Sequence, residues 1–445
     1  MAEWRDAQLS DLIDIKHGFA FKGEFFTDEP TEDILVTPGN FAIGGGFQLN
    51  KPKFYNGPVQ QEYVLKPGDV IVTMTDLSKQ ADTLGYSAVV PSLKARLLHN
   101  QRIGRVVARD RAANLSFIGW LMRTRPYRQE IVGGATGSTV KHTSPGRILA
   151  HRFKLPSPSE QQDIVDVLQP LEEKIELNRR MNETLEGMMQ AIFRDWFVDF
   201  GPVRRKEAGE ADPVAIMGGL TPDPARAAEL AALFPAAFGN DGLPVGWTSV
   251  PVSKLIAIIG GGTPKTSNSS YWNGPIPWFS VTDTPAGKDL FVFDTEKSIT
   301  QAGLDGSSAR LIPAGTTIIS ARGTVGNLAI AAQEMTFNQS CYALRSSEGD
   351  RPFFTFLAAA NLVEVLKGMA HGSVFSTITR QTFDGVHFAD AGASTMDAFD
   401  ATVAPLFSRI RAAVDENRTL AETRDYLLPR LMSGAVRVVP KVEAA

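Results

Sequence analysis

Two segments of the chain repeat apolar residues at alternating steps of three and four positions. This spacing places the residues on one stripe of a helix and is typical of helices that pair along a coiled-coil seam. In the segment 157–200, the seam positions include Leu168, Leu171, Ile175, Asn182 and Leu185. In the segment 393–434, they include Val403, Leu406, Ile410, Asn417 and Leu420. We expect two long helices that pair as an antiparallel coiled coil, although two core helices in separate bundles would show the same periodicity.

Local signals mark where the two helices begin. Ser157, followed by Pro158 and then by Glu160 three residues after the serine, has the form of a capping box. The second segment has the weaker pair Ser394 and Asp397 at the same spacing. The sequence therefore predicts that the first helix begins directly after Ser157, and it offers Ser394 as the weaker cap of the second.

Each seam also contains residues that weaken a helix. Asn182 and Asn417 place an amide in an apolar seam, where it needs a polar partner and thereby fixes the register. Pro170 and Pro405 occupy matching positions in the two segments. Because proline lacks the backbone N–H, we expect both helices to be kinked or broken there.

A tandem duplication organises the chain. Residues 4–22 and 247–265 share tryptophan, serine, leucine, isoleucine, glycine and lysine at matching positions, and Asn100-Gln101 recurs as Asn338-Gln339. The region before each long helix mixes strand and turn signals, such as the β-branched runs 70–72 and 317–319. The predicted fold class is α/β (α+β), with two mixed globular domains that are each followed by a long helix.

These signals divide the chain into six parts. They are a first globular domain at 1–156, a first long helix at 157–200, a linker at 201–244, a second globular domain at 245–392, a second long helix at 393–434 and a C-terminal tail at 435–445. The alanine-rich part of the linker, residues 225–237, predicts one short helix in an otherwise glycine-, proline- and charge-rich segment.

Composition limits the class and the compartment. Of the 445 residues, 43% are apolar and 21% are charged, which is typical of a globular protein. The single cysteine, Cys341, excludes an intramolecular disulfide and fits a reducing compartment. No window resembles a membrane span, and the charged N-terminus lacks the apolar core of a secretory signal. We expect a cytoplasmic protein.

The overall net charge of −4 hides a segregation of charge along the chain. Residues 94–154 contain thirteen basic and two acidic side chains, a net charge of +11, whereas residues 1–93 have a net charge of −6. A basic stretch is what a phosphate-facing surface needs, although arginines scattered over solvated faces would give the same count.

No catalytic or metal-binding motif stands out. The chain has no phosphate loop, no HExxH motif and no metal-ligand spacing among its six histidines. The glycine runs 44–46 and 260–262 lack the spacing of a dinucleotide fingerprint and predict turns. We expect no cofactor, metal or catalytic residue in this chain. The alternative that these absences leave open is an enzyme whose motifs are not recognised, namely a self-contained DNA methyltransferase or nuclease.

The order and the duplication of several short motifs resemble the specificity (S) subunit of type I restriction–modification systems. In chain order, these motifs are His99-Asn100-Gln101, Gly137-Ser138-Thr139-Val140-Lys141, Pro156-Ser157-Pro158-Ser159-Glu160-Gln161, Phe193-Arg194-Asp195-Trp196-Phe197-Val198-Asp199-Phe200, Leu243-Pro244-Val245-Gly246-Trp247 and Phe337-Asn338-Gln339. The second helix departs from the family pattern, because residues 391–394 replace the proline-rich entry of the first helix.

This resemblance implies a division of labour between subunits. Each globular half would be a target-recognition domain that binds one part of an asymmetric, bipartite site in double-stranded DNA, and the paired helices would set the spacing. The outer helix faces would dock two modification subunits, which bind S-adenosylmethionine and methylate adenine. Restriction subunits, which use ATP and Mg, would complete the complex. The chain itself would be non-catalytic, without a cofactor and without a membrane partner.

Loop residues with a cation, an amide or a hydroxyl group are the candidates for DNA contact. In the first half they are Lys22, Thr75, Lys79, Arg102, Ser138, Thr139, Lys141 and His142. In the second half they are Lys265, Thr266, Arg322, Thr324, Ser373, Ser376, Thr377 and Arg380. Asn100-Gln101 and Asn338-Gln339 recur in both halves and cannot by themselves distinguish two half-sites. For this reason we expect them to serve folding or phosphate contact.

A coiled-coil protein scaffold without DNA contact is the non-enzymatic alternative. The +11 stretch argues against it. Salt dependence would decide, because counterion release makes phosphate binding steeply dependent on salt.

Overall fold

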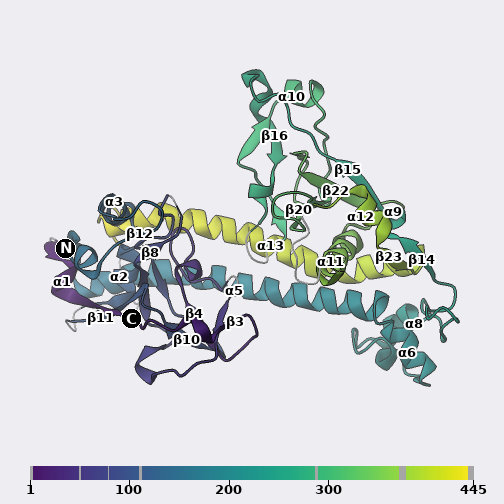
Figure 1. The fold of residues 1–445 in the computed structure, drawn as a ribbon, viewed down its shortest axis with the longest axis horizontal. Coiled ribbons are helices and arrows are strands. Elements are labelled where there is room, and N and C mark those ends of the chain that lie inside the picture. The colour runs from purple at the N-terminus through teal and green to yellow at the C-terminus, as the bar shows by residue number, and fades with distance from the viewer. Residues whose placement is uncertain are drawn as a thin grey trace, which may run out of the picture. The chain divides into compact units, whose positions relative to one another are not determined.

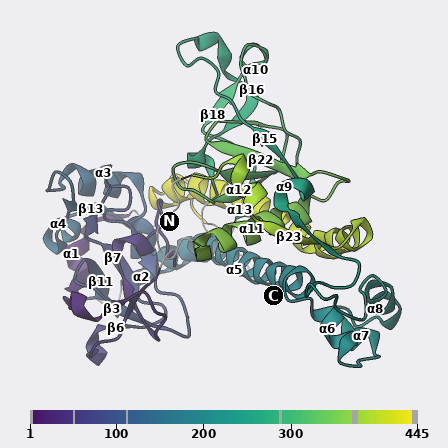
Figure 2. The same cartoon turned by 45° about the vertical axis from the view of Figure 1, so that its right-hand side comes forward.

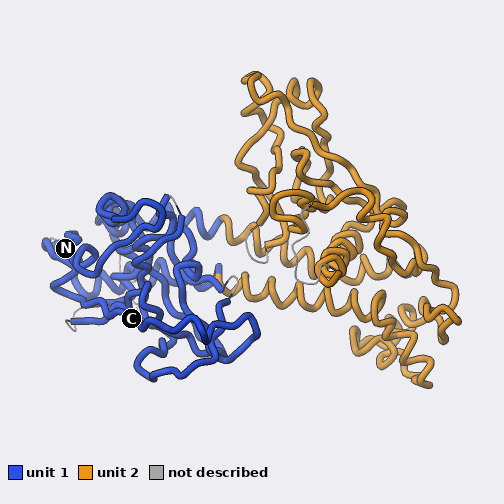
Figure 3. Tube along the Cα trace, in the orientation of Figure 1, with its two compact units in different colours: residues 1–175, 419–445 blue, residues 176–418 orange. Residues whose placement is uncertain are grey.

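The computed structural model describes residues 4–49, 52–78, 80–109, 113–285, 289–369 and 377–438. The chain forms two compact units, drawn in blue and orange in Figure 3. Unit 1 comprises residues 1–175 and 419–445, and unit 2 comprises residues 176–418. The boundary cuts both long helices, so that each unit contains part of each helix.

Unit 1 is built on two sheets and two short strand pairs. The four-stranded antiparallel sheet has the order β2 (Ile13–His17), β11 (Ile103–Ala108), β7 (Val70–Thr73) and β9 (Ser87–Val89). The five-stranded sheet has the order β3 (Phe26–Thr27), β5 (Lys53–Tyr55), β4 (Asp33–Val36), β10 (Arg96–His99) and β6 (Val64–Leu65). The pairs are β1 (Arg5–Gln8) with β13 (Arg152–Leu155), and β8 (Thr75–Asp76) with β12 (Lys141–His142).

Side-chain alternation along the central strands of unit 1 produces two cores. Val72 and Val106 point to one face of the four-stranded sheet and pack with helical residues such as Phe117. Ile71 and Ile103 point to the opposite face and pack against the five-stranded sheet. The helices on the chain before the first long helix are α1 (Leu9–Leu12), α2 (Leu115–Leu121), α3 (Arg125–Gly133) and α4 (Pro145–Leu149), with the 3-10 turns η1 (Gly23–Phe25), η2 (Pro38–Asn40) and η3 (Gln61–Tyr63).

Unit 2 repeats this plan with larger variations. Its five-stranded sheet has the order β15 (Ile256–Gly260), β22 (Cys341–Ser346), β19 (Thr317–Ser320), β20 (Leu328–Ala331) and β17 (Phe291–Val292). A second sheet contains β18 (Lys297–Ile299), β16 (Trp272–Phe279) and β21 (Thr336–Phe337), and β14 (Thr248–Pro251) pairs with β23 (His387–Asp390). The remaining short elements are α9 (Val252–Leu255), α10 (Gln301–Asp305), α12 (Arg380–Gly385), η4 (Ser269–Tyr271) and η5 (Val281–Asp283).

The duplication is visible in matched backbone details. Strands β2, β11, β7 and β9 of unit 1 have the same order and pairing as β15, β22, β19 and β20 of unit 2. An added Cβ at Gly18 would lie 2.3 Å from the carbonyl oxygen of Asn100, and one at Gly261 would lie 2.2 Å from that of Asn338. Both asparagines accept a hydrogen bond from the backbone N–H two residues later. We expected these asparagines to serve either folding or phosphate contact. The matched turns support the folding role in both halves.

Each unit contains an antiparallel section of the two long helices α5 (Pro158–Phe197) and α13 (Ala393–Met432), which Figure 1 and Figure 2 both draw side by side. In unit 1, Arg424 Nη1 donates to Glu172 Oε2 at 2.7 Å. In unit 2, Asn178 Nδ2 donates to Asn417 Oδ1 at 2.9 Å. None of the ten predicted seam residues is exposed. The predicted fold class, with two α/β regions and a pair of long helices, is confirmed.

Both prolines lie inside continuous helices, so the helices are not broken there, and a kink at either proline stays a prediction. Pro170 and Pro405 are exposed positions of α5 and α13, each of which runs over 40 residues. Their rings face water, where solvent can satisfy the carbonyl that loses its partner. The packed seam on the opposite face then stabilises the helix across the missing hydrogen bond.

The two helix entries differ in the way the sequence suggested. Glu160 Oε2 accepts from the Ser157 backbone N–H at 3.1 Å, and Ser157 Oγ accepts from the Glu160 N–H at 3.3 Å, which completes the predicted capping box. In the second helix, the expected N-cap at Ser394 is wrong, because α13 already begins at Ala393. Asp397 instead forms an ion pair with Arg351 at 2.5 Å.

The segment 201–244 contains three helices, where we expected one. They are α6 (Gly201–Glu207), α7 (Pro213–Ile216) and α8 (Pro224–Ala231). Asp212 and Asp223 cap α7 and α8, each directly before a proline at the first helical position. Residues of this segment, including Val203 and Phe234, enter the same core as Trp196 and Trp247 of unit 2.

Among the described residues, one helix is long and apolar enough to cross a membrane by length and composition, namely α11 (Pro352–Met369). Eight of its residues are buried in unit 2, and it packs on β19, β20 and β22. Phe354 and Phe356 belong to the main core of that unit. These contacts are those of a core helix.

Candidate nucleic-acid interface

In unit 1, several predicted DNA-contact residues gather where β8 pairs with β12. The strand register places His142 opposite Thr75 and Lys141 opposite Asp76. Thr75 Oγ1 lies 3.2 Å from His142 Nδ1. The backbone of Arg102 joins the group, because its carbonyl accepts from the N–H of Met74, the residue before β8. Segments that are far apart in the sequence thus meet here, with His142 and Arg102 exposed, Lys141 half-buried and Thr75 buried.

A tight turn presents the next candidates beside this strand pair. Ser138 and Thr139 are exposed in the turn that precedes β12. Lys141 Nζ donates to the Gly137 carbonyl at 2.9 Å. Gly137 has a φ of +95°, and an added Cβ would lie 2.0 Å from the Val140 carbonyl oxygen, so this turn requires glycine.

A buried carboxylate supports the β8 side of the surface. Asp76 accepts hydrogen bonds from the N–H of Ser78 at 2.6 Å and from the N–H and hydroxyl of Thr83 at 2.5 and 2.6 Å. Burial alone would raise the pKa of Asp76, but the hydrogen bonds from Thr83 and Ser78 outweigh it and lower the pKa. Asp76 is therefore a charged anchor that joins β8 to Ser78 and Thr83.

Unit 2 has the same backbone junction with different side chains. The N–H of Ile378 donates to the Ala321 carbonyl at 2.9 Å, as the N–H of Thr143 donates to the Met74 carbonyl at 3.0 Å in unit 1. This equivalence places Thr377 at the position of His142.

The remaining described candidates of unit 2 surround that junction. Thr377 Oγ1 donates to the Ala321 carbonyl at 3.1 Å. Arg322 and Thr324 are exposed in the loop after β19, and the carbonyl of Thr324 accepts from the hydroxyl of Ser320. Arg380, the first residue of α12, donates to the carbonyl of Ile258 at 3.1 Å.

Other candidates are not part of these two groups. Lys22 is exposed and lies 3.5 Å from Glu24, and Lys265 and Thr266 are exposed in the loop after β15. Within the described ranges, no hydrogen bond or ion pair joins these three side chains to the candidate groups. Lys79, Ser373 and Ser376 lie outside the described residues.

The basic stretch 94–154 is not one continuous phosphate-facing surface. Among its described basic side chains, five form ion pairs inside unit 1, mostly with the acidic first segment: Arg96 with Asp33, Arg105 with Asp69, Arg109 with Asp14, Arg123 with Glu172 and Lys154 with Asp6. The sequence could not reveal this, because each partner is distant along the chain. The positive charge of this stretch therefore serves ion pairing inside unit 1 as well as any phosphate-facing surface.

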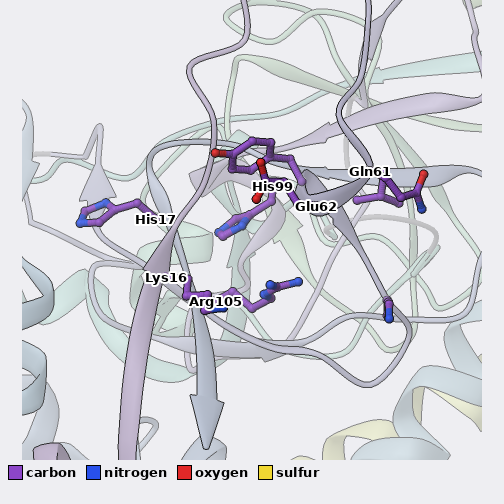
Figure 4. A pocket seen from close by; sticks show the side chains of 9 residues that line it. Lys16, His17, Gln61, Glu62, His99 and Arg105 are labelled. Carbon is purple, nitrogen blue, oxygen red and sulfur yellow. The ribbon is translucent and has the colours of Figure 1, made fainter. Parts of the chain in front are cut away.

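The sequence also missed a cleft in unit 1, which is shown in Figure 4. Its lining includes Lys16, Lys66, His99 and Arg105. His99 Nε2 lies 2.9 Å from the Ile103 carbonyl, so this nitrogen is the donor. Burial lowers the pKa of His99 to about 4, and the imidazole is neutral at pH 7.

No site for a cofactor or metal is evident in the part of the chain that the structure describes. Within those ranges, no three histidine, cysteine, aspartate or glutamate side chains lie close enough together to bind a metal ion. Cys341 is buried on β22, and burial raises the pKa of its thiol to about 12.

Comparison with known proteins identifies the family. Residues 1–187 and 244–388 match the type I restriction modification DNA specificity domain. The chain is 29% identical over 317 residues to the HindI specificity subunit from Haemophilus influenzae, which covers 64% of this chain and 69% of that protein. It is 27% identical over 146 residues to the MjaIX specificity subunit from Methanocaldococcus jannaschii, which covers 32% and 34%.

A solved structure supports the fold assignment independently. The S subunit of a type I restriction–modification system from M. genitalium matches 96% of both chains with a TM-score of 0.54 at 14% identity. The family match includes both halves and most of the chain. The chain belongs to the type I restriction–modification specificity subunits, and it is the DNA specificity subunit of such a system rather than a catalytic one.

Proposed function

We propose that this chain reads an asymmetric, bipartite DNA site, with residues 1–156 and 245–392 as the two target-recognition domains. The observation that carries the proposal is the repeated junction described above. In unit 1 it presents His142 beside the buried Thr75, and in unit 2 it presents Thr377. Equivalent backbone with different side chains is what two different half-sites require, because base-edge contacts specify sequence.

The candidate residues divide into two roles within this proposal. Exposed cations contact phosphates and position the protein, whereas hydroxyl and imidazole groups of the junctions reach base edges. We assign the phosphate role to Lys22, Arg102, Lys141, Lys265, Arg322 and Arg380. We assign the base-edge role to Ser138, Thr139, His142, Thr266, Thr324 and Thr377, and we assign to the buried Thr75 the role of positioning His142. We also propose Lys79, Ser373 and Ser376 as DNA-contact residues, on the basis of the sequence alone.

The helices 157–200 and 393–434 would act as the spacer between the two half-sites and as the docking surface for partners. Leu177 and Met188 of α5 lie three turns apart on one face and are 54% and 48% exposed. Exposed apolar residues on one face suit a protein partner. We propose two modification subunits that bind S-adenosylmethionine, joined by restriction subunits that use ATP and Mg, in the cytoplasm.

The first experiment measures binding to random-sequence duplex DNA by mobility shift, with the chain alone and with its modification subunit. We expect protection of two short sequences separated by a gap of fixed length, and loss of binding when the gap changes. If neither preparation binds DNA at low salt, the proposal fails and the scaffold reading replaces it. Cleavage or methylation of DNA by the chain alone would instead favour the enzymatic alternative.

A charge-reversal pair tests the interface within unit 1. We expect Lys141→Glu with Arg102→Glu to weaken DNA binding and to reduce the slope of log K against log salt. The matched control reverses Arg204 and Arg226, two arginines of the linker. Equal affinity for the Lys141/Arg102 variant and its control would remove these two residues from the interface.

A further inference from the structure

A cleft of 620 Å³ lies between the two sheets of unit 1. Figure 4 shows its lining, which comes from β2, from the segment η3–β6 with the turn that follows, and from β10 and β11. Lys16, Lys66 and Arg105 supply positive charge, and Glu62 is the acidic residue among the lining side chains. His99 is buried and neutral, as described above, and adds no charge at pH 7.

The unit itself neutralises the positive groups of the cleft only in part, since Arg105 has an acidic partner in Asp69. Arg105 and Lys16 are directly opposite each other on neighbouring strands, a position in which like charges destabilise a sheet. The Arg105 Nε is buried and has no hydrogen-bond partner among the described residues, and its Nη1 lies 3.8 Å from Asp69. A buried donor without an acceptor is destabilising. An anion in the cleft would offset the repulsion between Lys16 and Arg105 and would accept a hydrogen bond from the Arg105 Nε.

The second half of the chain shows that the fold does not require these charges. The strand pair that corresponds to Lys16 and Arg105 is Ile259 opposite Ala343. Phe337, directly before the repeated Asn-Gln, is fully buried at the position of His99.

The turn that contributes the second lysine is also matched. The N–H of Asp69 donates to the Lys66 carbonyl at 3.0 Å, and the N–H of Thr316 donates to the Pro313 carbonyl at 3.3 Å. The lysine of the first half is thus replaced by a proline in the second. Unit 2 fills the region with an apolar cluster that includes Ile312, Phe337 and Ala343, where unit 1 has a basic cleft.

We propose that this cleft binds a phosphate group, with Arg105 at its base and Lys16 and Lys66 at its rim. A guanidinium offers two parallel N–H donors to phosphate oxygens, and the lysines add mobile positive charges. The phosphate comes either from the backbone of the DNA that the chain reads, which rests on the proposed function, or from a free nucleotide. The site is confined to the first half, so it makes the two halves unequal.

The test uses the full chain and one double variant, Lys16→Gln with Lys66→Gln. The matched control is Lys53→Gln with Lys94→Gln, two exposed lysines of the same unit that do not line the cleft. Inorganic pyrophosphate is titrated by calorimetry at constant ionic strength, and duplex DNA affinity is measured between low and moderate salt. Arg105→Gln is a second variant, and thermal unfolding reports whether each variant folds.

We expect the cleft variant to bind pyrophosphate at least about tenfold more weakly than the control, and to reduce the DNA salt slope by about one. Loss of pyrophosphate binding with an unchanged slope assigns the site to a free nucleotide. A reduced slope without pyrophosphate binding assigns it to the DNA backbone. If neither quantity differs between the variant and the control, the proposal is overturned. Failure of the wild-type chain to bind DNA specifically would defeat the proposed function, while the pyrophosphate titration still reports on the cleft.

Discussion

At the scale of single residues, the buried ion pairs of unit 1 connect its globular part to both long helices. Glu172 of α5 lies between Arg123, at 3.2 Å, and Arg424 of α13, at 2.7 Å. Burial would raise the pKa of Glu172, but the two guanidinium groups outweigh it and lower the pKa. Arg123 Nε also donates to the carbonyl of Gly44 at 2.9 Å. The glycine run 44–46 is thus a turn, as predicted, and it contacts this ionic group.

Removing the central carboxylate should destabilise unit 1. We expect Glu172→Gln to lower the free energy of unfolding by about 3 kcal/mol, because it leaves the buried Arg123 guanidinium without its paired carboxylate and leaves Arg424 with Asp425 alone. Urea unfolding monitored by tryptophan fluorescence measures the change. The control is Glu173→Gln on the exposed face of the same helix turn, which should change stability by less than about 0.5 kcal/mol. Similar values for the two variants would show that the ionic group does not stabilise the unit.

The histidine of the cleft makes stability depend on pH. Burial lowers the pKa of His99 to about 4, whereas an unfolded chain has a histidine pKa of about 6.5. Between these values the unfolded state binds a proton that the folded state does not, so stability falls as the pH falls from 6.5 to 4. The full effect is at most about 3 kcal/mol.

The duplicate supplies the variant for this test, because Phe337 occupies the matching buried position. We expect wild type to lose about 2 kcal/mol more than His99→Phe between pH 6.5 and pH 4.5, measured by urea unfolding at both values. Carboxylates that titrate in this range contribute equally to both proteins and cancel in the difference. Parallel pH curves would contradict the prediction.

At the scale of elements, the parts that sequence predicted best are those set by local periodicity. A seam of regular spacing extends over both helices. The existence of the two helices, their pairing with each other and the cap at Ser157 could therefore be predicted from residues close together in the sequence. Pro170 and Pro405 misled because tertiary packing stabilises a helix that local rules would interrupt. The three helices of 201–244 were missed although Asp212 and Asp223, each before a proline, are helix starts that could have been recognised.

The seam asparagines also show that local sequence patterns do not reveal contacts between the two helices. The sequence led us to expect Asn182 and Asn417 as register-setting amides, and Asn182 is fully buried. The partner of Asn417, however, is Asn178, whose Nδ2 also donates to Glu416 Oε2 at 2.7 Å. Periodicity identifies seam positions, but the offset between two antiparallel helices depends on contacts across them.

A double-mutant cycle tests this pair. We expect Asn178→Leu alone to cost about 1–3 kcal/mol, because it leaves the amide of Asn417 buried without its partner. Asn178→Leu with Asn417→Leu should recover most of that loss, since a matched apolar pair suits the seam. Denaturant unfolding of the four proteins gives the coupling free energy. Strictly additive effects would indicate that the two amides do not depend on each other.

At the scale of the whole molecule, the two units share the helix pair, since each contains part of α5 and part of α13. Sequence reasoning predicted the duplication because matched residues recur along the chain. It did not find the backbone junctions or the cleft, because both join segments separated by dozens of residues. Met74 meets Thr143, and Lys16 meets Arg105, only after the sheets have formed. The candidate interface was therefore predicted as a set of loops, and its grouping required the structure.

The spacer proposal makes a prediction that depends on helix length alone. Seven residues inserted into α5 after Ile175, and seven into α13 before Thr419, preserve the heptad phase of the seam. They lengthen both helices by about 10 Å, which corresponds to about three base pairs at 3.4 Å each. We expect binding to the original site to be lost and to return for a site whose gap is about three base pairs longer. Because that gap also rotates one half-site about the DNA axis, the recovered affinity should be lower than that of wild type.

The control for this prediction inserts seven residues after Gly209, in an exposed turn of the linker that leaves both helices intact. Mobility shifts with a series of gaps, each one base pair longer than the last, give the preferred gap of each protein. The linker variant should keep the original gap, because no seam position moves. If the helix variant also keeps it with undiminished affinity, the helices do not set the distance between the half-sites. The gap would then be determined by the recognition domains, and the matching phase of the two seams would serve folding and partner binding alone.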